Sequence, residues 1–332
     1  MSDFEIEIER YLKNLPPDVL GLCSTNSIEI LDMFSGAYNL NFHVRVNKKE
    51  FIFRINIDQQ SGLKNQIEYE DNALRFLEEY NIAPKTYYVD NTLKYFDFGI
   101  LIEQYLEGPH LSLEETHIVE AAELLVKLHS LPLVKSDFII WQNPLEATVN
   151  FVKNDMLNYE AKKTHDKKLI RLAKEVMART EKDIEDKRNL FHADSLNHTD
   201  VVLDNFIRTS DGLRLIDWEK PRVDDCTYDI CCFLSELPQL WCSERVLNMA
   251  NRESFLNTYS RLSGIEKNLL LEKIRIREPL VSLHWVFWGA IKLSNLRDSC
   301  TATELLNAHE EKISRYERVA RPENIERILE TL

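Results

Sequence analysis

The glycines of this chain are few and far apart, which restricts how it can bind a nucleotide. Only 8 of the 332 residues are glycine, whereas average usage would give roughly 23. No two of them are closer than nine residues. A dinucleotide-binding fingerprint needs three glycines close together, and a P-loop needs two followed by a Lys. Neither pattern occurs, so any phosphate site in this chain must be built in another way.

The bulk composition is that of a folded protein without a membrane segment. Hydrophobic residues make up 44% of the chain and charged residues 29%, close to the globular average. No apolar run approaches the length of a transmembrane helix, and residues 1–13 lack the pattern of a signal peptide. The six cysteines show no metal-ligand spacing and are typical of reduced thiols. We therefore expect a cytoplasmic protein that does not bind a membrane.

The formal net charge of -14 limits the class of partner. A nucleic-acid-binding protein would need a basic face, so we expect no nucleic-acid partner. An acidic chain is compatible with a cationic small-molecule substrate, although acidity for solubility alone is the commoner explanation.

The hydrophobic pattern changes at about residue 107, where Gly108-Pro109 interrupts the chain. Before it, period-2 alternation predicts strands within 27–56 and a helix follows up to Pro84. After it, the pattern predicts mainly helices, at 114–130, 144–159, 166–187, 252–262 and 278–295, with short strands at 205–208 and 213–217. We expect an α+β chain with a small antiparallel-sheet N-terminal lobe, residues 1–107, and a larger, mostly helical C-terminal lobe, residues 108–332.

One motif indicates phosphoryl-transfer chemistry. His198, Asp200 and Asn205 follow the pattern H-x-D-x4-N, and Asp217 comes twelve residues later at the end of an apolar strand. In kinases with this pattern the first Asp accepts the proton of the substrate hydroxyl, and the Asn and the second Asp hold Mg²⁺. Hard oxygen ligands suit Mg²⁺. We predict Asp200 as the base, Asn205 and Asp217 as metal ligands, and His198 as the residue that braces the loop.

A second H-x-D pair, His192 and Asp194, lies just before this motif. Position 199 is Thr, where that pair would require the Asn. We interpret His192 and Asp194 as part of a solvated turn.

These residues resemble the aminoglycoside phosphotransferase and choline kinase superfamily from about residue 27 to 295. The resemblance implies a bilobal protein-kinase-like fold that uses ATP and Mg²⁺. It also implies a phosphate hairpin at residues 35–39, a phosphate-contacting position on the third strand, an ion-pair Glu on the following helix, and a hinge whose backbone meets the adenine. The cofactor-binding residues that it implies are Ser35, Gly36, Ala37, Tyr38, Asn39, Arg54, Glu70, Glu103 and Tyr105.

Several positions depart from the family pattern. Arg54 stands where a Lys is common, and its fixed fork can also bind phosphate and a carboxylate. Asp204 replaces the Gly that usually precedes the Asn and adds negative charge beside the metal site. For the ion-pair Glu, Glu70 is preferred over Glu68 because of its spacing from Leu74 and Leu77 along the helix. A solvated helix face accounts for either Glu nearly as well.

The spacing after Asp217 argues against a protein kinase. Asp229 follows only twelve residues later, which leaves no room for an activation segment. Val202 stands where serine/threonine kinases carry a Lys. The sequence therefore predicts a small-molecule kinase.

The acceptor is less constrained. Trp285 and Trp288 resemble the aromatic helix of choline and ethanolamine kinases, where aromatic faces surround a quaternary ammonium group. Glu219 and Asp224 are further candidate substrate residues. Packing of the two tryptophans in the core is the alternative interpretation. Aminoglycosides, homoserine, thiamine and methylthioribose stay open as acceptors.

The sequence thus predicts an ATP- and Mg²⁺-dependent kinase of a small hydroxyl compound, with a choline/ethanolamine-like or aminoglycoside-like substrate. The alternative is a catalytically weak or inactive binding protein of the same fold, which Asp204 alone favours. The oligomeric state is open.

Overall fold

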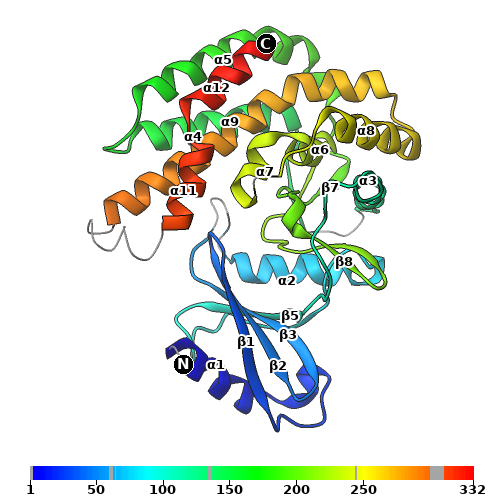
Figure 1. Ribbon diagram of the computed structural model, residues 1–332, viewed down its shortest axis with the longest axis vertical. Helices are drawn as coiled ribbons and strands as arrows, with labels where there is room; N and C mark the ends of the chain where they lie inside the picture. Colours follow the sequence, from blue (N-terminus) through cyan, green and yellow to red (C-terminus); the bar gives the residue numbers. More distant parts are fainter. Residues whose placement is uncertain (1–2, 60–62, 64, 134–136, 244, 300–309) are drawn as a thin grey trace. The chain divides into compact units, whose positions relative to one another are not determined.

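The computed structural model describes residues 3–59, 63, 65–133, 137–243, 245–299 and 310–332. The chain forms two compact units, drawn in Figure 1. The first comprises residues 1–109 and 207–221, and the second comprises residues 110–206 and 222–332. The N-terminal unit therefore includes a segment that follows the H-x-D-x4-N motif, in addition to the strand-rich first third of the chain.

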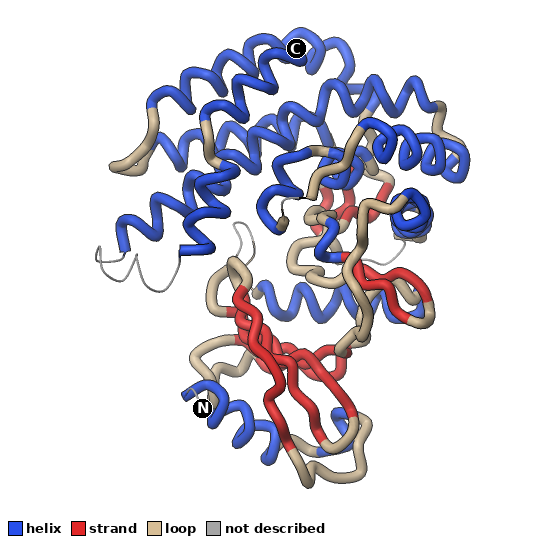
Figure 2. The backbone as a smooth tube through the Cα atoms, viewed as in Figure 1, coloured by secondary structure: helices blue, strands red, loops and turns tan. Residues whose placement is uncertain are grey.

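The fold is α+β, as expected. The N-terminal unit contains an antiparallel five-stranded sheet, and the second unit is mostly helical (Figure 2). The sheet has the order β1-β2-β3-β5-β4. Its strands are β1 (Ile28–Ser35), β2 (Asn39–Val46), β3 (Lys49–Asn56), β4 (Thr86–Asp90) and β5 (Gly99–Gln104). The other elements of this unit are α1 (Asp3–Asn14), η1 (Pro17–Leu20), α2 (Gln66–Leu77), η2 (Glu78–Tyr80) and most of the hairpin of β8 (Phe206–Thr209) and β9 (Gly212–Leu215).

Alternation along the central strands separates an apolar face of the sheet from a face that carries charge. Phe51, Phe53 and Ile55 of β3 all belong to one buried cluster. Helix α1 joins that cluster, and α2 lies on the other side of the sheet (Figure 1). Because successive side chains of a strand point to opposite faces, Arg54 points away from the cluster. The strand that completes the apolar core therefore also sets the direction of Arg54.

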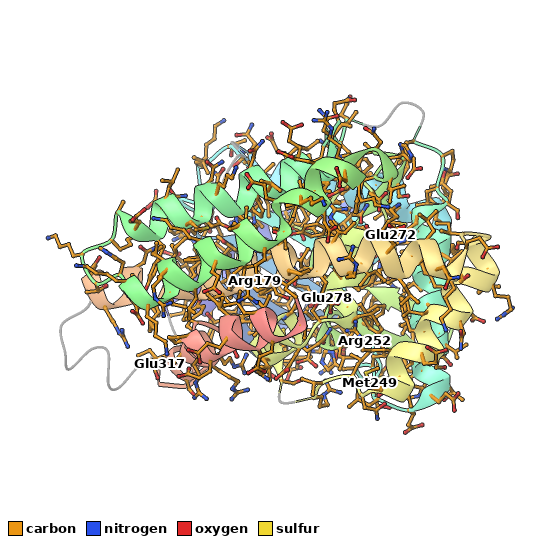
Figure 3. All side chains as sticks on the ribbon, turned by 90° about the horizontal axis from the view of Figure 1, so that it is seen from above. Arg179, Met249, Arg252, Glu272, Glu278 and Glu317 are labelled. Atoms are coloured by element: carbon orange, nitrogen blue, oxygen red, sulfur yellow. The ribbon has the colours of Figure 1, made fainter. Side chains whose placement is uncertain are left out.

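The second unit is built from helices around a short sheet of order β6-β10-β7. Helices α8 and α9 are joined by an ion pair of Arg252 with Glu278, at 3.0 Å, and the two residues are labelled in Figure 3. The elements are α3 (Glu115–His129), β6 (Ile139–Ile140), α4 (Pro144–Glu160), α5 (Lys167–Lys187), η3 (Arg188–Leu190), β7 (Ser195–Asn197), η4 (Leu203–Asn205), β10 (Arg222–Asp224), α6 (Thr227–Leu234), α7 (Glu236–Cys242), α8 (Met249–Ser263), α9 (Lys267–Ser299), α11 (Glu310–Val319) and α12 (Pro322–Thr331). No described helix is both long and apolar enough to cross a membrane.

Several helices differ from the sequence expectation, and for two of them, α6 and α9, the structure shows the physical reason. All eight residues of α6 are buried, so the helix has no polar face and its sequence lacks a 3.6-residue period. Helix α9 begins at Lys267 instead of residue 278 and continues through Pro279. Proline disfavours a helix interior, but Ile276 and Leu280 on either side of it are buried. Tertiary packing outweighs the local preference there.

Gly108 is required by close backbone packing within the N-terminal unit. A Cβ at this position would lie 2.1 Å from the carbonyl oxygen of Arg208. Arg208 cannot retreat easily, because its N–H donates to the carbonyl of Pro109 at 2.9 Å.

We therefore expect Gly108→Ala to lower the free energy of unfolding by about 1–3 kcal/mol through overpacking, measured by urea unfolding. Gly36→Ala is the matched control, since its Cβ would meet nothing closer than 3.4 Å. Equal stability of Gly108→Ala and the wild type would contradict the close approach.

Candidate functional site

Arg54 lies at the centre of a buried charge cluster in the N-terminal unit. Its Nη1 donates to Glu70 of α2 and to Asp217, the latter at 2.9 Å. Its Nη2 lies 3.4 Å from Glu103 of β5. The register places Ile52 opposite Glu103, so Arg54 and Glu103 share one face of the sheet. One guanidinium therefore holds carboxylates from a helix, a neighbouring strand and the segment after β9.

Burial and charge shift the ionisation of this cluster. Burial alone would lower the pKa of Arg54, but the carboxylates of Glu70, Glu103 and Asp217 outweigh it and raise that pKa well above its ordinary value. Burial raises the pKa of Glu70 from 4.5 to about 8, although Arg54 opposes the shift. Burial likewise raises the pKa of Glu103. Arg54 thus stays charged, while a proton on Glu70 is easily retained.

The structure distinguishes Glu70 from Glu68. Glu70 is fully buried and pairs with Arg54. Glu68 is exposed and accepts a hydrogen bond from Asn65, at 3.1 Å.

Asp217 occupies a sharp turn after β9. Its φ is +70°, a left-handed conformation that is uncommon for residues other than glycine. Trp218 is fully buried, and its indole N–H donates to the carbonyl of Leu215 at 2.8 Å. The buried indole fixes the turn, and the Asp217 side chain remains about one-third exposed.

Residues 35–39 form the tight connection from β1 to β2. The N–H of Gly36 donates to the carbonyl of Asn39 at 2.9 Å, which closes the turn. Asn39 is itself buried, and its amide donates to Glu219 and accepts from Asn56. Glu219, a sequence candidate for substrate binding, therefore bonds to the base of this turn in the N-terminal unit. Ser35, Ala37 and Tyr38 complete the segment.

Tyr105 follows β5 and stacks on His43, with ring centroids 3.7 Å apart. His43 also bonds to Glu50 at 2.9 Å. The ring of Tyr105 therefore packs against a side chain of β2.

In the second unit, the loop 198–205 brings Asp200 and Asn205 together. The amide nitrogen of Asn205 donates to the carbonyl of Asp200 at 2.9 Å and to its carboxylate at 3.2 Å. The N–H of Asp200 donates to Nδ1 of His198 at 3.3 Å. Because the nitrogen of the Asn205 amide faces Asp200, its oxygen is directed elsewhere. The loop thus couples the carboxylate and the amide through hydrogen bonds of its own.

Asp229 anchors the start of this loop. Its carboxylate accepts the N–H groups of His198 at 2.7 Å and Thr199 at 2.8 Å, and it contacts the ring of His129 at 3.2 Å. Thr199 has a φ of +75°, an outlier for a β-branched residue that costs on the order of 1–3 kcal/mol. From the sequence, Asp229 only excludes an activation segment, whereas in the structure its buried carboxylate stabilises that strained turn.

The second H-x-D pair lies outside this loop. His192 and Asp194 are exposed, and Asp194 accepts a hydrogen bond from Ser195 at 3.0 Å.

Asp224 is fully buried and paired with two arginines. It lies 2.6 Å from Arg277 and 3.0 Å from Arg222. The guanidinium of Arg222 stacks on the rings of Trp141 and Tyr228, 3.4 and 3.9 Å from their centroids. The charge of Asp224 is thus neutralised by this chain's own arginines, and these two aromatic faces already contact a cation.

Trp285 and Trp288 belong to an aromatic cluster of the second unit. Trp288 contacts Trp241, Trp285 and Tyr316, with centroid distances of 4.6, 5.3 and 5.5 Å. Trp285 and Tyr316 are buried, whereas Trp241 and Trp288 are half-buried. Trp285 therefore packs inside the unit, whereas Trp288 reaches its surface. Trp241 was missed because α7 is too short to show a periodic pattern.

The residues predicted to hold Mg²⁺ have suitable chemistry. Asn205 presents an amide oxygen and Asp217 a partly exposed carboxylate. Both are hard oxygen donors, and Mg²⁺ is commonly held by one or two carboxylates together with substrate phosphates. Among the described residues, no group of three or more His, Cys, Asp or Glu side chains forms a metal site.

The comparisons with known proteins identify the family. The sequence profile of the phosphotransferase enzyme family, APH, matches residues 32–265. A comparison with curated proteins gives no match.

Solved structures with the same fold include kinases of small alcohols. Choline kinase from Cryptosporidium parvum Iowa II is 19% identical, with a TM-score of 0.64 over 99% of this chain and 98% of that chain. Ethanolamine kinase from Plasmodium vivax is 17% identical, with a TM-score of 0.63 over 90% and 89%. The ADP-bound aminoglycoside phosphotransferase APH(2'')-Ib is 16% identical, with a TM-score of 0.55 over 97% of each chain. At these identities the likeness establishes the kinase-like fold.

The raised pKa of Glu70 predicts a pH dependence of stability. An acid whose pKa is higher in the folded than in the unfolded state loses its contribution to stability as the pH rises between the two values. We expect the free energy of unfolding of the wild type to fall between pH 4.5 and about 8 relative to Glu70→Gln. Urea unfolding at several pH values measures this difference.

Glu68→Gln on the exposed face of the same helix is the control and should keep the wild-type pH dependence. Parallel profiles of the wild type and Glu70→Gln would contradict the buried, protonatable state of Glu70.

Proposed function

Because this chain belongs to the phosphotransferase enzyme family, we propose that it transfers the terminal phosphoryl group of ATP to the hydroxyl of a small molecule. The observation that carries the proposal is the loop 198–205. It holds the Asp200 carboxylate and the Asn205 amide in direct hydrogen-bond contact, with Asp229 fixing the backbone that leads into it. In kinases with this pattern, the Asp accepts the proton of the substrate hydroxyl and the Asn of the same loop holds Mg²⁺.

The proposed roles follow from the chemistry of each side chain. When bound, ATP supplies the phosphoryl group and Mg²⁺ neutralises part of its charge. Asp200 orients the acceptor hydroxyl and takes its proton. Asn205 and Asp217 contribute oxygen ligands to the metal. Arg54 holds the Asp217 carboxylate and adds positive charge near the phosphates, with the turn at residues 35–39 as the backbone cradle.

The aromatic cluster supports an acceptor with a cationic head group. Trp241 and Trp288 are half-buried and contact each other, and aromatic faces of this kind attract ammonium groups. Trp141 does not fit this role, because Arg222 already covers its ring. We propose a choline- or ethanolamine-like alcohol as the acceptor class, with aminoglycosides as the second candidate, since both kinds of enzyme are among the structural relatives.

Asp200→Asn tests the catalytic assignment. Loss of the base should lower kcat by about 10²- to 10⁴-fold, with little change in ATP binding. The measurement is ADP release with choline, ethanolamine, homoserine and an aminoglycoside as acceptors.

Asp194→Asn is the matched control, because it alters the neighbouring H-x-D pair and leaves the loop intact. Undiminished turnover by Asp200→Asn would refute the assignment. Failure of the wild type to phosphorylate any acceptor, together with retained nucleotide binding, would favour the inactive binding protein instead.

Trp288→Ala tests the ammonium site. Removal of the ring should raise KM for a quaternary ammonium alcohol by about 2- to 30-fold, the equivalent of one cation–π contact. Trp288→Phe keeps an aromatic face and should retain most of the affinity. An equal KM in all three proteins would show that the cluster only packs the unit.

A further inference from the structure

Asp204 departs from the family pattern at a sensitive place. It occupies the middle of the three-residue turn η4 and directly precedes Asn205. Its side chain is a carboxylate, at a position where the resemblance implies that a glycine is usual. Such a group beside a magnesium ligand adds negative charge and can bind the ion itself. The chain therefore needs something that controls this carboxylate.

Arg245 supplies that control within the second unit. Its Nη2 donates to the carboxylate of Asp204, and its Nη1 donates to the carbonyl of Leu111 at 2.7 Å. Leu111 in turn donates its N–H to the carbonyl of Phe206, the residue after Asn205, at 3.3 Å. One guanidinium thus bonds to the turn and to a backbone segment that is itself bonded to the end of the turn.

A second contact holds the beginning of the turn from the same region of the chain. The N–H of Leu203 donates to the side-chain oxygen of Gln239, at 2.9 Å. Gln239 is fully buried in α7, and its nitrogen donates to the carbonyl of Phe233 at 2.9 Å. Arg245 follows α7 by three residues. Gln239 and Arg245 therefore hold the turn at its first residue and at its middle residue, respectively.

We propose that Arg245 is a positioning residue for the proposed phosphotransfer. It binds the Asp204 carboxylate, so that this carboxylate does not compete for Mg²⁺ and the Asn205 amide keeps its orientation. The proposal rests on the proposed function and explains how the chain tolerates Asp204. Both side chains are about one-third exposed, so solvent weakens their attraction. The benefit is therefore the geometry of the turn and the occupation of the carboxylate, more than net stability.

Arg245→Gln should lower kcat by about 10- to 100-fold, the range found when a partner of a metal-binding residue is removed. Excess Mg²⁺ should inhibit this variant more than the wild type, because the released carboxylate binds the ion unproductively. Adding Asp204→Gly should restore most of kcat and abolish the extra inhibition, since it removes the group that Arg245 controls. Steady-state kinetics across a Mg²⁺ series measure both effects.

Arg275→Gln is the matched control. It removes a different exposed ion pair, with Asp183 at 2.6 Å, and should leave kcat and the Mg²⁺ dependence unchanged. A purely structural role of Arg245 would predict lower thermal stability and no rescue by Asp204→Gly. Wild-type kinetics in Arg245→Gln, or equal defects in the single and double variants, would overturn the proposal.

Amide hydrogen exchange tests the contact between Arg245 and Asp204 independently of an enzyme assay. In Arg245→Gln the amides of residues 203–206 should exchange about 2- to 5-fold faster, and unchanged exchange there would overturn the positioning role. If the wild type phosphorylates no acceptor while exchange changes as expected, the proposed function fails and the Arg245 contact stands.

Discussion

The buried guanidinium of Arg54 is the interaction on which the N-terminal unit depends. It is almost fully buried and faces three carboxylates, those of Glu70, Glu103 and Asp217. Removing one member of a buried ion pair is costly, because the other charge is left without compensation. The ion pairs of Arg54 therefore connect three elements, namely helix α2, strand β5 and the turn after β9. The position of that side chain is set in turn by β3, whose apolar residues fill the opposite face.

The second unit uses a buried carboxylate in the same way. Asp229 accepts two successive backbone N–H groups and so stabilises the left-handed conformation of Thr199. Strained backbone persists only where its surroundings determine it, and it is concentrated at functional sites. Asp217 is a comparable outlier in the first unit, fixed by Arg54 and by the buried indole of Trp218. Buried side chains thus stabilise, at Thr199 and at Asp217, a conformation that the local sequence does not favour.

The sequence was sufficient for the fold class and for the segments that carry the site, because period-2 alternation and the H-x-D-x4-N spacing are local patterns. It placed Arg54 on a strand and Glu70 on the next helix, and the family resemblance implied that the two residues pair. It could not reveal Asp229, Gln239 or Arg245 as partners of the loop 198–205. These contacts join residues about 30 to 40 positions apart, and the buried helix α6 between them has no periodic signal.

The charges of the second unit also narrow what an acceptor can meet there. The sequence suggests that the Asp224 carboxylate is available to a cationic substrate. In the structure it is buried and forms ion pairs with Arg222 and Arg277, which neutralise its charge. Arg222 in turn covers the faces of Trp141 and Tyr228. Trp241 and Trp288, by contrast, are half-buried and contact each other. Because the protein's own arginines neutralise Asp224 and cover Trp141 and Tyr228, an ammonium group would not find these three side chains available.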